Sequence, residues 1–233
     1  MDVKLTVVQP AYFPTIRTLS RISSADVVVW GETFVYKRNA TIHRARIKTA
    51  AGAHWLTIPV LTKGRRGQLI RDVEIDPTHH WQRSHIKSLR VNYRNTPYYF
   101  FLAEEIAGLL RQKWRSLNDV ALESTKFLCA KMGLPCRFVK SGDLPVVQDR
   151  SERVRQWLRS CGCETYVIEK DDEKYIDPRV IEKDGGRMLS LDFTHLNYHQ
   201  SFGAFVADLS ALDLLFNEGE MSESIVRTSH QLR

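Results

Sequence analysis

The chain has 233 residues, of which 43% are apolar and 26% are charged, and its formal net charge is +7. This balance excludes the disordered and fibrous classes, and the length suits one domain with a substantial buried core. The N-terminus lacks the pattern of a signal peptide, and no apolar run approaches the roughly 18 to 20 residues needed to cross a bilayer, so we expect a cytoplasmic protein without a membrane span.

The chain opens with a strand, a turn and a helix. Residues 5–8 are mostly apolar and predict a buried strand, and two prolines make residues 9–14 a rigid turn. Apolar side chains at helical spacing cover residues 16–22, and residues 26–30 predict a second strand. This order of elements is typical of an α/β fold.

The positive charge is concentrated in one segment, because residues 33–71 contain no acidic side chain. Within it, residues 42–48 alternate with period two, which in a strand places three cations on one face. After a turn at Gly52, residues 55–60 predict the partner strand of a hairpin, with Pro59 at an edge or a strand end. The cations of the segment outnumber the net charge of +7 and are Lys37, Arg38, Arg44, Arg46, Lys48, Lys63, Arg65, Arg66 and Arg71.

The cations at Arg44, Arg46 and Lys48 fit an anion site. Neighbours two apart on a strand stand roughly 6 to 7 Å from each other, which suits the phosphates of a diphosphate or of a nucleic-acid backbone. Arginine adds a planar fork that binds oxyanions in bidentate fashion. A solvated strand face explains the pattern equally well, and the absence of acids favours the anion site.

Helices and strands alternate in the rest of the chain. A helix follows residues 79–81, an aromatic cluster follows Pro97, and Asn118 is expected to cap a long helix that Gly133 ends. The later predicted elements are a strand at 136–139, a helix at 151–161, a strand at 166–168 and a helix at 209–217.

These elements predict an α/β fold with a mainly parallel sheet, flanked by helices and carrying a basic β-hairpin insertion. We expect a single domain over residues 1–219, since no linker or repeat divides the chain. Residues 220–233 are polar and are expected to form a frayed tail.

No local motif states a reaction. The Walker loop, the dinucleotide fingerprint, the nucleophile elbow and the paired-histidine zinc helix are absent as patterns, and we expect no cofactor. The four cysteines lack metal-site or redox spacing and are expected to be free thiols. His80 is a candidate general base, because imidazole titrates near neutral pH; a metal pair with His85 lacks a third ligand, and the same holds for His195 and His199.

Asp213 is the most unusual acid, because it lies in an apolar helix and must be paired, capped or functional. Ser210 precedes it by three residues, which fits a capping box in which the acid bonds back to the serine amide. A catalytic role for Asp213 is the alternative, since a helix N-terminus also binds anions.

Taken in order, these segments resemble the WbqC-like family, whose members are encoded among bacterial O-antigen and other surface-glycan genes. Residues 8–14 match the family's opening turn, residues 44–48 its arginine-rich strand, and residues 55–60 its Trp-Leu-Thr-x-Pro-Val strand. Later matches are His80-Trp81, Tyr93 with Pro97-Tyr98, Tyr175-Ile176-Asp177, Tyr198 with Gln200, and Phe205 leading into Leu209-Ser210. Departures from the family pattern are Val8 in place of histidine, Ala45 in place of asparagine, and Glu169-Lys170-Asp171 in place of a glycine-rich turn.

The resemblance implies transfer of a glycyl or other acyl group onto an amino group of a nucleotide-activated sugar. The donor would arrive activated, for example as aminoacyl-tRNA or a nucleotide-linked compound, because the chain has no recognisable ATP site. His80 and Asp213 are the catalytic candidates. The substrate-binding candidates are Gln9, Pro10, Tyr12, Arg44, Arg46, Lys48, Trp55, Trp81, Tyr93, Tyr198, Gln200, Ser210 and Asn217.

Two other functions fit the same residues. A nucleic-acid-binding module, with tRNA or another RNA as partner, would use the acid-free basic segment together with the aromatic side chains of Trp55, Trp81 and Tyr93. An adenylyltransferase-like enzyme would use the opening strand, turn and helix, although the paired histidines of such enzymes are missing.

Overall fold

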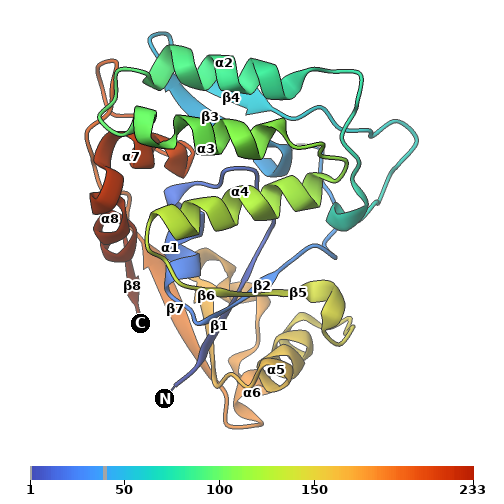
Figure 1. The fold of residues 1–233 in the computed structure, drawn as a ribbon. Coiled ribbons are helices and arrows are strands. Elements are labelled where there is room, and N and C mark those ends of the chain that lie inside the picture. The colour runs from blue at the N-terminus through green and yellow to red at the C-terminus, as the bar shows by residue number, and fades with distance from the viewer. Residues whose placement is uncertain (1, 39–40) are drawn as a thin grey trace.

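The computed structural model describes residues 2–38 and 41–233, and its centre is a six-stranded sheet (Figure 1). The strands lie in the order β5-β2-β1-β6-β7-β8; all neighbours pair in parallel except β8, which runs antiparallel to β7. The prediction of a mainly parallel sheet is confirmed. The strands are β1 (Lys4–Val8), β2 (Val27–Trp30), β5 (Arg137–Lys140), β6 (Thr165–Glu169), β7 (Arg187–Phe193) and β8 (His230–Leu232).

Helices cover both faces of the sheet because side chains along each central strand alternate between two cores. On β2, Val28 and Trp30 belong to the core that contains α1, α4 and α7, whereas Val27 and Val29 belong to the core that contains α5 and α6. The helices are α1 (Ile16–Ser23), α2 (Trp81–Tyr93), α3 (Tyr99–Arg111), α4 (Leu117–Lys131), α5 (Arg150–Cys161), α6 (Pro178–Glu182), α7 (Ala211–Glu218) and α8 (Ser222–Thr228).

The chain leaves the sheet after β2 and returns at β5, and the segment between them contains a separate antiparallel hairpin, β3 (Arg44–Thr49) with β4 (Gly52–Thr57), followed by α2, α3 and α4. In Figure 1 the hairpin, α2 and α3 lie at the end of the molecule opposite the N-terminus. This insertion confirms the predicted basic hairpin, and Pro59 follows β4 rather than interrupting it.

The long helix α4 begins differently from the prediction. Its cap is Ser116, whose Oγ accepts a hydrogen bond from the Asp119 amide at 3.2 Å. Asn118 lies inside the first turn, where its Oδ1 accepts from the indole N–H of Trp30 at 2.9 Å. The buried indole needs an acceptor, and this requirement takes the asparagine away from capping.

The expectation that residues 220–233 fray is wrong. They form α8 and β8, and β8 closes the edge of the sheet beside β7. Val226 is fully buried, and the Ser20 hydroxyl lies 2.7 Å from Nδ1 of His230. A few apolar side chains and one strand pairing therefore order a segment whose composition is mostly polar.

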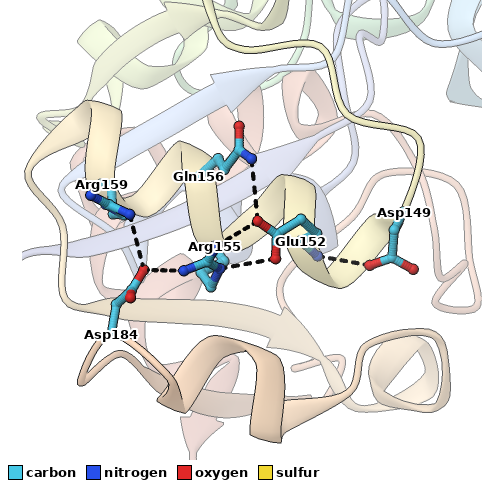
Figure 2. A network of polar contacts seen from close by, with 6 residues as sticks. All are labelled: Asp149, Glu152, Arg155, Gln156, Arg159 and Asp184. Atoms are coloured by element: carbon cyan, nitrogen blue, oxygen red, sulfur yellow. Dashed lines mark hydrogen bonds and ion pairs between the residues drawn. The ribbon is translucent and has the colours of Figure 1, made fainter.

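The outer side of α5 carries a network of paired charges (Figure 2). Arg155 forms ion pairs with both Glu152 and Asp184, and Arg159 lies 3.5 Å from Asp184. Asp149 caps the helix by accepting from the Glu152 amide at 2.8 Å. Each cation in this network therefore has a carboxylate partner.

The four cysteines of the chain are all free, as predicted. None of the helices in residues 2–38 and 41–233 combines the length and the apolar character that crossing a bilayer requires.

Candidate functional site

The hairpin presents two arginines around one tryptophan. Cross-strand register places Arg46 opposite Trp55 and Arg44 opposite Thr57, so the three long side chains share one face. The guanidinium carbons of Arg44 and Arg46 lie 5.3 and 5.7 Å from the centroid of the Trp55 ring. Trp55 is 39% exposed, so this face is open to solvent. The indole, with two guanidiniums close to its ring, is suited to an anion that carries a flat or apolar portion.

The charge of these arginines is not neutralised. Within residues 2–38 and 41–233, neither Arg44 nor Arg46 forms an ion pair with a carboxylate. The buried Nε of Arg44 has no hydrogen-bond partner in the described chain. Burial, with the Arg44 charge as a second cause, lowers the pKa of the neighbouring His43 to about 4. The face is therefore positive and short of acceptors.

A cleft of about 410 Å³ lies between β4 and α2, beside this face. Trp55 belongs to both the arginine face and the cleft, and Trp81 forms part of the opposite wall. The polar groups of the cleft are mainly imidazoles and hydroxyls, contributed by His54, Thr57, His79, His80, Ser84, His85 and Ser88.

One of these imidazoles, His85, is held in place. Its Nε2 lies 3.2 Å from the Thr57 carbonyl oxygen, which can only accept, so Nε2 carries the proton. Nδ1 then accepts from the Tyr12 hydroxyl at 3.0 Å. Burial lowers the pKa of His85 to about 4, so the ring is neutral near pH 7. Both nitrogens are occupied, which leaves no proton-transfer function for His85 in this arrangement.

His80 differs from His85 and from His79. The ring of His79 lies 3.3 Å from Asp76 and 3.1 Å from the Thr78 hydroxyl. His80 is exposed, directly precedes α2, and forms no side-chain cap bond. Its side chain has no hydrogen-bond partner among the residues that the structure describes. The cleft is therefore lined by one predicted base, His80, whose side chain is without a hydrogen-bond partner in the described residues.

A model of the WbqC-like protein family matches residues 9–225. The chain belongs to this family. It is also 28% identical over 230 residues to the uncharacterized protein Rv1507c of Mycobacterium tuberculosis (strain ATCC 25618 / H37Rv), a match that covers 98% of this chain and 99% of the relative. No solved structure matches the chain.

Several residues of the WbqC-like resemblance gather around Asp213, away from the cleft. Oδ1 of Asp213 accepts from the Tyr93 hydroxyl and Oδ2 accepts from the Tyr198 hydroxyl, both at 2.8 Å. The Tyr93 oxygen also accepts from the Lys48 amide at 2.9 Å. Asp213 is wholly buried, and this burial raises its pKa, against the lowering effect of the tyrosine bonds and the Lys48 charge.

The predicted capping box is wrong in one half. Ser210 does cap α7, since its Oγ accepts from the Leu212 amide at 3.2 Å. Its own amide donates to the Arg46 carbonyl at 2.7 Å rather than to Asp213. The tyrosine hydroxyls, brought to Asp213 by α2 and by the segment before α7, satisfy the carboxylate instead. Asn217 supports the same helix by donating from Nδ2 to the Asp213 carbonyl at 2.7 Å.

Lys48 shares the strand face of Arg44 and Arg46 but is only 1% exposed. Its Nζ donates to Oε1 of Gln200 at 3.1 Å and to the Ala204 carbonyl at 2.6 Å. Residues 194–209 therefore cover Lys48, and it is not open to a ligand in this conformation. The predicted stripe of three cations is reduced to two at the surface.

The two predicted catalytic residues are far apart. His80 lies at the start of α2, whereas Tyr93, the partner of Asp213, ends that helix. A helix of this length spans roughly 18 to 20 Å at 1.5 Å per residue. His80 and Asp213 thus do not act on one atom in this structure, and the catalytic role of each stays a prediction.

The predicted site residues of the opening turn lie in different environments. Gln9 is exposed at the carboxyl end of β1, next to β6, where the strand order reverses and where α/β sheets commonly bind ligands. Pro10 is buried, and Tyr12 lies behind the cleft, where it contacts two of its lining side chains, His85 and Trp81. The start of α7 joins the turn to the hairpin, since the Ala211 amide donates to the Pro14 carbonyl at 2.8 Å.

Sequence reasoning did not assign His54, Thr57, Ser84 or Ser88 to the site, although all four line the cleft. Ser84 and Ser88 follow Trp81 at helical spacing on α2. This spacing would have placed all three side chains on one face of the predicted helix. In the part of the chain that the structure describes, no group of three or more His, Cys, Asp or Glu side chains is arranged to hold a metal ion.

Proposed function

We propose that this WbqC-like chain is a transferase that moves a glycyl or other acyl group onto an amino group of a nucleotide-activated sugar or a related phosphate-bearing metabolite. The observation that carries the proposal is the pair of arginines without carboxylate partners, Arg44 and Arg46, beside Trp55 at the edge of the cleft. Family membership supports it as a second, weaker argument.

The arginine face suits the phosphate-bearing part of the substrate. Two guanidiniums offer several N–H donors in fixed forks, which match the oxygens of a diphosphate. Trp55 provides a flat surface for a base or a sugar ring. The cleft of about 410 Å³ falls within the range of small-molecule sites and has room for the reacting amine beside His80.

The reaction assigned to this site forms one bond and breaks another. The amine nitrogen attacks the carbonyl carbon of the activated acyl group, and a tetrahedral oxyanion forms. The bond from that carbon to the leaving oxygen or sulfur then breaks, and an amide is the product. His80 accepts the proton from the attacking nitrogen and returns it to the leaving alcohol or thiol.

The donor in this proposal arrives activated, as an aminoacyl ester of tRNA or as a nucleotide-linked or thioester compound. Asp213, being buried, is given a positioning role: it holds residues 194–209 against β3 through Tyr198, while Gln200 bonds Lys48. Gln9 lies outside the cleft and is kept as a candidate contact for a substrate that extends over the sheet.

An enzyme assay tests this proposal. The protein is incubated with a panel of UDP- and dTDP-linked amino sugars and with activated glycyl donors, including glycyl-tRNA and a glycyl thioester, and products are identified by mass spectrometry. We expect amide formation with at least one pair. For His80→Asn we expect a rate at least about a hundredfold lower, with unchanged substrate binding.

His79→Asn is the matched control, because His79 adjoins His80, lines the same cleft and is already hydrogen bonded. It should leave the rate within about threefold of wild type, since the general base is intact. The proposal fails if no pair yields an amide, and the role of His80 fails if both variants lose the same activity.

A further inference from the structure

The outer side of α2, together with the residue that caps its C-terminus, carries four cations outside the cleft. Arg83, Lys87, Arg90 and Arg94 are spaced by four, three and four residues, which places them on one face of the helix, and all four are exposed. In the described residues none of them forms an ion pair. We call this set the α2 stripe.

Large apolar side chains are exposed at the end of this stripe. Phe100 and Phe101, in the first turn of α3, are 75% and 77% exposed, and Val91 of α2 is 61% exposed. Only a short connection separates α2 from α3, and the two helices pack together (Figure 1). Phe100 contacts the ring of Tyr99. Burial raises the pKa of Tyr99, and the positive charge of Arg90 is close enough to oppose this rise. The Arg90 charge and the exposed Phe100 ring therefore both lie beside Tyr99, where the stripe adjoins the start of α3.

This combination fits a lipid surface better than a nucleic acid. Cations attract anionic headgroups, and phenylalanine rings without a polar group gain by entering the boundary between headgroups and acyl chains. Neighbouring residues on a helix project about 100° apart, so the two rings do not form parallel platforms for successive bases. Both rings can still enter one interface from the end of a helix.

We propose that the outer face of the α2–α3 hairpin docks on an anionic bilayer, with the α2 stripe on the headgroups and Phe100, Phe101 and Val91 in the interface. The two acids on the same part of α3, Glu104 and Glu105, are paired with Arg111 at 3.5 Å and with Lys131 at 2.6 Å, and neither forms an ion pair with the stripe. Ser84 and Ser88 of the same helix line the cleft, so a docked molecule holds the cleft near the headgroups.

The test is co-sedimentation of the full chain with vesicles. Vesicles of phosphatidylglycerol mixed with phosphatidylcholine should bind the protein, pure phosphatidylcholine vesicles should bind it far less, and added salt should weaken binding. Phe100→Ser with Phe101→Ser should lower the partition coefficient at least about tenfold. Lys87→Gln with Arg90→Gln should lower it by roughly fivefold for each charge removed.

Matched controls separate the surface from total charge and total apolarity. Arg179→Gln with Lys183→Gln removes two exposed charges from the region of α6, and Val146→Ser removes a side chain that is 92% exposed elsewhere. Both should bind vesicles as wild type does. All altered side chains are exposed, so each variant should keep the wild-type melting temperature, which circular dichroism checks.

Three results would overturn the proposal: no binding to phosphatidylglycerol vesicles, equal losses in stripe and control variants, or loss of affinity for labelled single-stranded RNA in the stripe variants while vesicle binding is unchanged. The amide-forming assay above uses substrates in solution. Failure of that assay and failure of vesicle binding are therefore distinguishable.

Discussion

The arginines of α5 and those of the β3–β4 hairpin differ in whether they have carboxylate partners. Around α5, Arg155 pairs with Glu152 of the same helix, and both Arg155 and Arg159 pair with Asp184, which follows α6 (Figure 2). On the hairpin, Arg44 and Arg46 stand beside Trp55 without a carboxylate. Paired surface charges are already compensated, whereas two adjacent guanidiniums repel each other, and a bound anion would compensate both charges. The second region is therefore where a binding function is to be sought.

The largest expected effect concerns the one buried carboxylate close to the hairpin. Asp213→Ala leaves two tyrosine hydroxyls without their acceptor and removes the negative charge nearest the buried Lys48 ammonium, and we expect it to lower the free energy of unfolding by about 3 to 5 kcal/mol. Urea denaturation measures this change.

The double variant Lys48→Met with Asp213→Asn serves as the control, because it removes both charges. It should be more stable than the summed effects of Lys48→Met alone and Asp213→Asn alone predict. Strict additivity would contradict the coupling between Lys48 and Asp213 and would make this part of the hairpin electrostatically no different from α5.

The second effect concerns how the two regions respond to acid. The folded-state pKa values of His43 and His85 are lowered to about 4, mainly by burial, so the unfolded chain binds protons more readily below about pH 6.5. Stability should be constant above pH 7 and should fall between pH 6.5 and 4, with His85 alone contributing about 3 kcal/mol over that window.

The α5 network should respond at lower pH. Bonds from Arg155 and Gln156 lower the pKa of Glu152 to about 2, so its contribution is present above the unfolded value near 4.5 and is lost as pH falls toward 2. Melting temperatures across this range should show two separate losses. His85→Gln should flatten only the first, and a wild-type profile without any loss between pH 6.5 and 4 would contradict this account.

The smallest effect is expected for the paired charges themselves. Arg155→Ala breaks partly exposed ion pairs at the protein surface, and such pairs contribute little, so the melting temperature should fall by less than about 3 °C. Arg44→Ala should lower the melting temperature by no more than Arg155→Ala does, because it removes the contact with the Trp55 ring but no ion pair. A clearly larger destabilisation by Arg44→Ala would show that the arginine is a structural residue rather than a ligand-binding one.

Much of the fold follows from local patterns in the sequence. Buried runs such as residues 5–8 and 26–30 marked the parallel strands, and the alternation of residues 44–48 marked the hairpin. Other elements depended on contacts between distant residues. Asn118 was expected to cap a helix, but it bonds Trp30, and β8 is ordered only because it pairs with β7.

The candidate site was predictable in composition but not in arrangement. The resemblance pointed to Arg44, Trp55 and Trp81, which the structure brings to one cleft and its margin. It gave no means of separating them from Tyr93, Tyr198 and Asp213, because only tertiary packing decides that the latter are buried. Likewise, the alternation of residues 44–48 places Lys48 on the same face as the arginines. The segment that buries Lys48 contains Gln200, which lies about 150 residues later in the sequence.

The most direct test of the central claim is calorimetry with a UDP-linked amino sugar on three proteins: wild type, Arg44→Ala with Arg46→Ala, and Arg155→Ala with Arg159→Ala. Both double variants lose the same charge. If the hairpin face binds the phosphates, the first double variant should bind at least about a hundredfold more weakly, near 2.7 kcal/mol, and the second should bind as wild type does. Equal affinity in all three proteins, or no heat with any nucleotide sugar in the panel, would contradict the account.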